Sequence, residues 1–103
     1  MRRAPACRYG GEEFAVILPR QSVDDAAAVA RRFRTELRER TWNRTEGLLI
    51  TASFGVTDLL RISEATVNAM VHSADGALYQ AKKQGKDRVV MAPIIERGLR
   101  ASA

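Results

Sequence analysis

The order of the predicted elements indicates an α+β fold in one small domain: strand, strand, helix, strand, helix, strand. An apolar run follows a pair of glycines near the start, two later segments repeat apolar residues at helical spacing, and residues 48–56 alternate as a strand does. At 103 residues the chain is long enough for one domain and too short for two. The hairpin and the flanking helices favour an antiparallel-rich sheet over a parallel doubly wound sheet.

A hairpin is predicted at the start of the chain. Glu12–Leu18 carries the run FAVIL, which is typical of a strand buried on both faces. Cys7–Tyr9 is its expected partner, because Gly10 and Gly11 reach the positive φ values that tight hairpin turns need. Pro19 lacks an amide proton and ends the strand.

The first helix is predicted over Val23–Arg40. Ser22 is a good N-cap, and Asp24 and Asp25 suit the positive end of the helix dipole. Apolar residues recur along one face, and the outer face is expected to carry arginines: Arg31, Arg34 and Arg38.

The second half of the chain predicts a strand, a helix and a closing strand. Leu48–Val56 alternates cleanly and reads as a sheet strand. Thr66 can cap a second helix, for which Gly85 supplies the C-terminal stop. Arg88–Met91 follows as the last strand, and residues 92–103 are expected to form a tail outside the domain.

Composition narrows the class of protein. The net charge of +5 favours an anionic partner, such as nucleotide phosphates or nucleic acid. Cys7 is the only cysteine, so no internal disulfide can form, and it reads most simply as a small buried apolar residue. No apolar run approaches the ~18 residues of a membrane span, and the start lacks the apolar stretch of a signal peptide. We expect a cytoplasmic location and no membrane span.

Two adjacent carboxylates, Glu12 and Glu13, begin the predicted strand and point to opposite faces, so at least one must meet solvent, a cation or a metal. Mg²⁺ is held by one or two carboxylates together with substrate phosphate oxygens, and neighbouring glycines let a ligand come close. Chemistry alone leaves two readings open, a metal–nucleotide site and a solvated hairpin turn, and it favours the turn.

Three sequence blocks resemble one family. RYGGEEFAVILP (8–19) matches the signature of GGDEF domains, the bacterial diguanylate cyclases, in its GGEEF variant. TASFGV (51–56) is similar to the family's strand motif TxSxGV, and ADGALYQAKKQGKDRV (74–89) to its closing motif ADxALYxAKxxGRNRV. The resemblance implies a partial GGDEF fold, a cyclase or ferredoxin-like palm, in which two facing domains each bind one GTP and condense the pair into cyclic di-GMP.

The resemblance also implies roles for the signature residues. Glu12 would be a metal ligand and would help to deprotonate the attacking 3′-hydroxyl, while Glu13 would help to hold the second of two Mg²⁺ ions. Gly10 and Gly11 would leave room for the nucleotide. A metal pair of this kind neutralises charge as a phosphoryl group is transferred.

Lys82 and Lys86 match the family's two basic positions that hold the terminal phosphates. The family more often has arginine at the second position, and lysine replaces a bidentate fork with a point charge. Without the resemblance, these residues would read as a solvated basic helix end. Phe14 and Tyr79 are expected in the core on either reading.

The resemblance covers the C-terminal part of a GGDEF domain. Residues 1–91 would form a truncated domain without the N-terminal part that carries a metal-binding aspartate and the guanine-reading Asn and Asp, and this form would be inactive on its own. Met1 and Ala4 occupy the positions of the inhibitory RxxD motif, which is therefore absent. Arg32 matches a helix arginine that some members use in the same inhibitory complex.

Two other classes of function stay open. One is a non-catalytic GGDEF remnant that acts as an interaction or dimerisation module, associating through sheet edges left exposed. The other is a nucleic-acid-binding domain, suggested by the positive charge, but no aromatic stacking platform or known binding motif supports it, and we rank it lowest.

Overall fold

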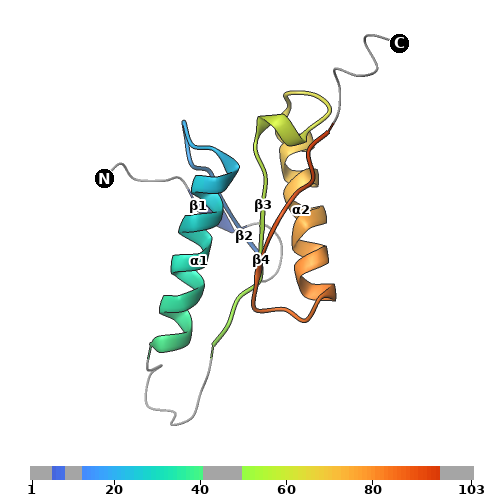
Figure 1. Ribbon diagram of the computed structural model, residues 1–103. Coiled ribbons are helices and arrows are strands. Elements are labelled where there is room, and N and C mark those ends of the chain that lie inside the picture. The colour runs from blue at the N-terminus through green and yellow to red at the C-terminus, as the bar shows by residue number, and fades with distance from the viewer. Residues whose placement is uncertain (1–5, 9–12, 41–49, 96–103) are drawn as a thin grey trace.

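The computed structural model describes residues 6–8, 13–40 and 50–95 (Figure 1). In chain order the elements are β1 (Ala6–Arg8), β2 (Phe14–Val16), α1 (Val23–Glu39), β3 (Phe54–Val56), the short 3₁₀ helix η1 (Leu59–Arg61), α2 (Val67–Lys83) and β4 (Val89–Met91). The predicted order of strands and helices is confirmed, and η1 is an addition that the sequence did not predict.

Helix α1 begins where the sequence predicts. The Ser22 side chain accepts a hydrogen bond from the Asp25 amide, and the Asp25 carboxylate accepts one from the Ser22 amide, which forms a capping box. The two bonds satisfy amide groups that a helix start leaves without partners.

Helix α2 is also capped at both ends as predicted. The Thr66 side chain accepts a hydrogen bond from the Ala69 amide at a distance of 3.0 Å. At the other end Gly85 has a φ of 126°, and the Lys86 amide donates to the Ala81 carbonyl at 2.9 Å. This is the Schellman arrangement that glycine favours after a helix.

The strand pairing corrects the prediction of an antiparallel-rich sheet. β1 and β2 form the predicted antiparallel hairpin, with Cys7 opposite Ala15, but β3 and β4 pair in parallel, with Gly55 opposite Val90. A single helix, α2, carries the chain back along the β3–β4 pair before β4 starts, so the second strand of the unit has to run in the same direction as the first. The fold is therefore mixed α/β in the described residues.

The third strand is shorter than the predicted Leu48–Val56. Regular strand covers Phe54–Val56, and residues 48 and 49 lie outside the described residues. Backbone hydrogen bonds extend the pairing at both ends, because the Phe54 amide donates to the Arg88 carbonyl and the Ala92 amide donates to the Val56 carbonyl, each at 2.8 Å.

The apolar run of β2 is exposed, which corrects the prediction of a strand buried on both faces. Phe14 is 70% exposed and Ile17 64% exposed, because β2 pairs with β1 and no helix of the described residues packs over it. Tyr79 was also expected in the core. It lies on the outer face of α2, 62% exposed, with the Lys83 ammonium 5.9 Å from its ring centroid.

The core lies where β3 and β4 run between α1 and α2 (Figure 1). Its buried side chains are mostly small: Val23, Ala27, Ala30, Ile62, Ala77, Ala81 and Ala92. Small residues let helix and strand backbones approach closely. The closest approach is at Gly55, where a methyl group would overlap the Ala74 carbonyl oxygen and the Leu78 amide nitrogen.

A polar network joins the start of α1 to the connection after β3. The Asp58 carboxylate accepts hydrogen bonds from the amides of Val23 and Leu60 and pairs with Arg61 at 3.1 Å. Arg61 in turn donates to the Ala92 carbonyl at 2.7 Å. Both charged side chains are largely buried, so each needs the other to compensate its charge.

We predict that Gly55→Ala destabilises the protein by about 1–3 kcal/mol, because the added methyl group forces backbone apart in the packed core. The measurement is chemical denaturation followed by circular dichroism.

The matched control is Gly76→Ala, within α2 itself, where nothing lies near the added methyl group. It should stabilise the protein by about 0.5–1 kcal/mol, since alanine is the better helix former. Equal effects at the two positions would show that close packing at Gly55 does not matter.

Candidate functional site

Two of the predicted site residues meet across the fold. Glu13, just before β2, lies near Lys82 in the last turn of α2, with 3.4 Å between the carboxylate oxygen Oε2 and Nζ. They are 69 residues apart in the sequence. The signature segment and the closing helix, which the sequence could only place separately, are thus adjacent in space. Gly10, Gly11 and Glu12 lie outside the described residues.

Both side chains of this pair remain accessible. Glu13 is 41% exposed and Lys82 is 47% exposed, so neither charge is locked in the interior. An exposed pair of this kind is weak and exchanges readily with other partners. A carboxylate and an ammonium held in this way can therefore turn to a metal ion and a phosphate.

Lys86, the second predicted phosphate residue, lies in the turn after α2. Its φ is 65°, and the φ of Asp87 is 50°, so two non-glycine residues in succession adopt the left-handed conformation. Such residues cost on the order of 1–2 kcal/mol each and need support from their surroundings. The Lys86 amide is held by Ala81, and the Lys86 side chain is exposed.

The support comes from contacts made by Asp87. Its amide donates to the Ser53 hydroxyl at 3.0 Å, and Arg34 Nε donates to its carbonyl oxygen at 2.8 Å and to its carboxylate at 3.0 Å. Arg38 Nη1 also pairs with the Asp87 carboxylate. Arg38 is exposed and Arg34 is half-buried, so these two arginines of the outer face also contact Asp87.

Sequence reasoning missed this arginine–aspartate cluster. The available signal is the spacing of Arg34 and Arg38, which are four residues apart and so lie on one side of α1. Nothing in the local sequence shows that Asp87, far along the chain, would face them. The sequence marks Ser53 only as part of the block TASFGV, whereas in the structure its hydroxyl accepts the hydrogen bond from the Asp87 amide.

The described residues contain no group of three or more His, Cys, Asp and Glu side chains that could hold a metal. Glu13 supplies one accessible carboxylate, and its neighbour Glu12 is outside the described residues. Carboxylate oxygens are the ligands that Mg²⁺ prefers, and it commonly takes one or two from protein together with phosphate oxygens. The donor chemistry at Glu13 therefore fits Mg²⁺.

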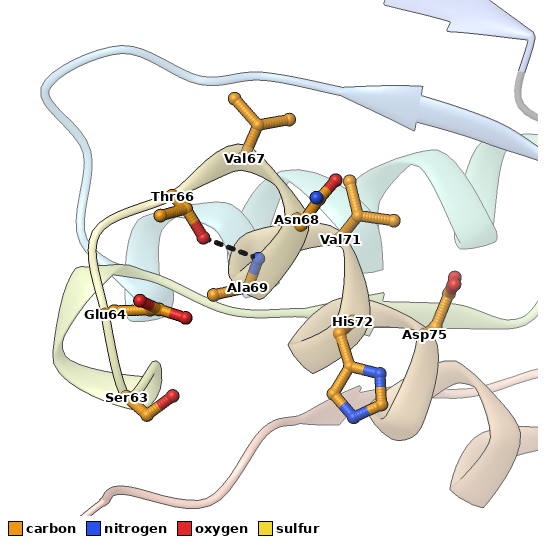
Figure 2. A pocket seen from close by; sticks show the side chains of 9 residues that line it. All are labelled: Ser63, Glu64, Thr66, Val67, Asn68, Ala69, Val71, His72 and Asp75. Atoms are coloured by element: carbon orange, nitrogen blue, oxygen red, sulfur yellow. Dashed lines mark hydrogen bonds between the residues drawn. The ribbon is translucent and has the colours of Figure 1, made fainter.

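A hollow in the described part of the chain lies elsewhere. It is open, about 620 Å³ in volume, and surrounds the start of α2, where Glu64, His72 and Asp75 line it (Figure 2). The Thr66 hydroxyl already caps the helix there, as the dashed line shows. Helix α2 has 17 residues and is therefore roughly 25 Å long. The hollow lies toward its start and Lys82 lies in its last turn.

Arg32, the residue matched to an inhibitory complex, lies on the exposed side of α1. Its guanidinium is accessible to a ligand or to another domain. It is separate from the Arg34–Arg38 side that contacts Asp87.

Comparison with known proteins places this geometry in context. The model of the family "Diguanylate cyclase, GGDEF domain" matches residues 1–88. Diguanylate cyclase VdcA of Vibrio cholerae is 40% identical over 89 residues, and response regulator PleD of Caulobacter vibrioides is 38% identical over 87 residues. These alignments take in 82% of the chain but only 26% of VdcA and 19% of PleD, so the chain spans about a quarter or less of these relatives.

Solved structures of diguanylate cyclases have a fold similar to that of this chain. The GGDEF domain of DgcB from Caulobacter crescentus, determined in complex with c-di-GMP, superposes with a TM-score of 0.75 at 34% identity, over 85% of this chain and 53% of that one. Diguanylate cyclase SiaD from Pseudomonas aeruginosa, in complex with its activator SiaC, gives a TM-score of 0.75 at 41% identity, over 89% of this chain and 35% of that one. The resemblance inferred from three sequence blocks is confirmed.

We predict that Glu13→Gln and Lys82→Gln each change the free energy of unfolding by less than about 1 kcal/mol, because the pair is exposed and screened by solvent. Thermal or urea unfolding measures this directly. A loss of several kcal/mol in either variant would mean that the pair is a structural element and not an adaptable part of a site.

Proposed function

Because this chain belongs to the GGDEF family of diguanylate cyclase domains, we propose that it provides the metal and phosphate side of a site that condenses two GTP molecules into cyclic di-GMP. The observation that supports this most strongly is the contact of Glu13 with Lys82, which joins a signature carboxylate to a phosphate-binding lysine. The activity is that of a nucleotidyltransferase, and pyrophosphate is the second product.

The proposed reaction needs little covalent participation by the protein. The 3′-hydroxyl oxygen of one GTP attacks the α-phosphorus of a second GTP held by a facing domain, a P–O bond forms, and the bond to pyrophosphate breaks. The reciprocal attack by the second 3′-hydroxyl closes the ring, so two pyrophosphates leave for each cyclic di-GMP. Two bound Mg²⁺ ions would supply charge neutralisation at the phosphates. The protein contributes chiefly position and electrostatic complementarity.

Each site residue has one task in this proposal. Glu12 and Glu13 hold metal, and Glu12 assists removal of the 3′-hydroxyl proton. Gly10 and Gly11 leave space for the nucleotide. The basic group at the end of α2 grips the terminal phosphates through Lys82 and Lys86.

The cellular setting follows from the substrate. Within the part of the chain that the structure describes, no helix has both the length and the apolar character needed to cross a membrane. A cytoplasmic location, where GTP and Mg²⁺ are abundant, completes the proposal.

The proposal predicts that the 103 residues alone make no detectable cyclic di-GMP from GTP and Mg²⁺. They cover 53% of the DgcB domain, and the resemblance assigns guanine recognition to the other part of a GGDEF domain. Fusion of the first part of the DgcB domain to this chain should produce synthesis, measured by chromatography of the products. In that chimaera Glu12→Gln should abolish turnover, because the amide keeps the shape but removes the charge that the metal needs.

Two variants of the chimaera serve as controls. Asp75→Asn removes a carboxylate from the hollow at the start of α2 and should leave turnover unchanged. Lys86→Arg should do no harm, since arginine offers a bidentate grip.

Added cyclic di-GMP should not slow the reaction through an RxxD site, because Met1 and Ala4 occupy its positions. Full turnover in Glu12→Gln, or robust synthesis by the short chain, would contradict the assigned roles.

A second candidate function is a non-catalytic interaction or dimerisation module. The exposed apolar side chains of β2 favour it, since Phe14 is 70% exposed and Val16 is 56% exposed on the same face of the strand. The nucleic-acid-binding alternative has no comparable observation in its favour.

If β2 mediates association, the chain will form concentration-dependent dimers that Phe14→Ser/Val16→Ser disrupts, because the substitution removes the apolar surface that a partner copy would bury. Light scattering coupled to size exclusion provides the molar mass. A monomer at all concentrations, before and after substitution, would remove this candidate.

A further inference from the structure

Helix α1 contacts the turn that carries Lys86 through a single residue of that turn, Asp87. The Asp87 side chain is 22% exposed and is contacted by Arg34, which is 34% exposed, and by Arg38, which is 44% exposed. Arg34 reaches both the backbone carbonyl and the carboxylate of Asp87. Two cations thus compensate one carboxylate, which matters where a second anion is to bind close by.

The position of Asp87 shows why this compensation would matter for phosphate binding. It directly follows Lys86, at the C-terminal end of α2, where the helix dipole already contributes a partial negative charge. A phosphate gripped by Lys82 and Lys86 would therefore face both the dipole and the carboxylate. Like charges a few ångströms apart weaken binding unless a cation compensates them.

The same contacts fix the shape of the turn. Lys86 and Asp87 both have positive φ, and Asp87 is held through its amide by Ser53 and through its carbonyl by Arg34. Lys86 is held on its own account by Ala81 and Arg88. Without Arg34, however, the backbone of Asp87 would keep the Ser53 bond and lose the bond to its carbonyl oxygen. The direction in which the Lys86 side chain leaves the backbone depends on that pair of dihedral angles.

We propose that Arg34 and Arg38 are positioning residues for phosphate binding: they neutralise Asp87 and hold the turn from which Lys86 reaches the phosphates. This rests on the proposed function, which assigns phosphate to Lys82 and Lys86. It adds that helix α1, which carries no predicted phosphate ligand, influences the affinity with which Lys82 and Lys86 bind phosphate.

The test is calorimetric titration of the full chain with inorganic pyrophosphate and Mg²⁺ at 0.15 M salt, where charges more than about 8 Å from the ligand are largely screened. Arg34→Gln and Arg38→Gln should each weaken binding about three- to tenfold. Arg31→Gln is the matched control: it removes the same charge from an exposed position of the same helix and should change affinity by less than about twofold.

Removal of the aspartate charge makes the test specific. Asp87→Asn tolerates the left-handed conformation and needs no neutralisation, so it should bind at least as tightly as the unchanged chain. In the Asp87→Asn background, Arg38→Gln should no longer weaken binding. A loss that persists there, or that Arg31→Gln reproduces, overturns the proposal.

Hydrogen exchange of the Asp87 amide distinguishes a local effect on the turn from a loss of stability along the whole of α2. Arg34→Gln should accelerate this exchange while amides in the middle of α2 keep their protection, whereas uniform acceleration along α2 would indicate general destabilisation and contradict a positioning role. If the unchanged chain binds no pyrophosphate, the phosphate role of Lys82 and Lys86 fails and the proposed function with it. Pyrophosphate binding that ignores Arg34 and Arg38 contradicts only the present inference.

Discussion

The close approach of β3 and α2 at Gly55 is the constraint on which the rest of this structure depends. The absence of a side chain lets the strand backbone lie against the helix backbone at Ala74 and Leu78. This contact fixes α2 relative to the β3–β4 pair, and through it the position of the C-terminal turn. The turn carries Lys86. The backbone contact at Gly55 therefore determines where the basic end of α2 lies.

Local features of this fold could be predicted from the sequence because short-range chemistry determines them. Ser22 and Thr66 cap helices with their own side chains, and Gly85 ends α2 because it adopts a positive φ. The hairpin of β1 and β2 follows from the same kind of reasoning. Each of these depends on residues within a few positions of one another.

The errors share one cause, which is that burial and pairing depend on distant segments. An apolar run such as that of Phe14 predicts a buried strand, yet what covers a strand comes from other parts of a fold, and here β2 pairs only with β1 among the described residues. The parallel pairing of β3 and β4 depends on the path of α2 between them. The Val23–Asp58 hydrogen bond and the Arg34–Asp87 contact join residues that no local pattern connects. The family motifs named Glu13 and Lys82 separately, and the contact between them needed the folded chain.

The central claim is that the signature segment and the end of α2 form one site for metal and phosphate. Paramagnetic broadening of backbone amide resonances by Mn²⁺, added together with GTP, tests it most directly, because broadening decays steeply with distance from the ion. The account predicts strong broadening at Glu13 and over residues 82–87, with Ser63–Asp75 around the hollow at the start of α2 left sharp. Broadening centred on His72 and Asp75, or none at Glu13, would contradict it.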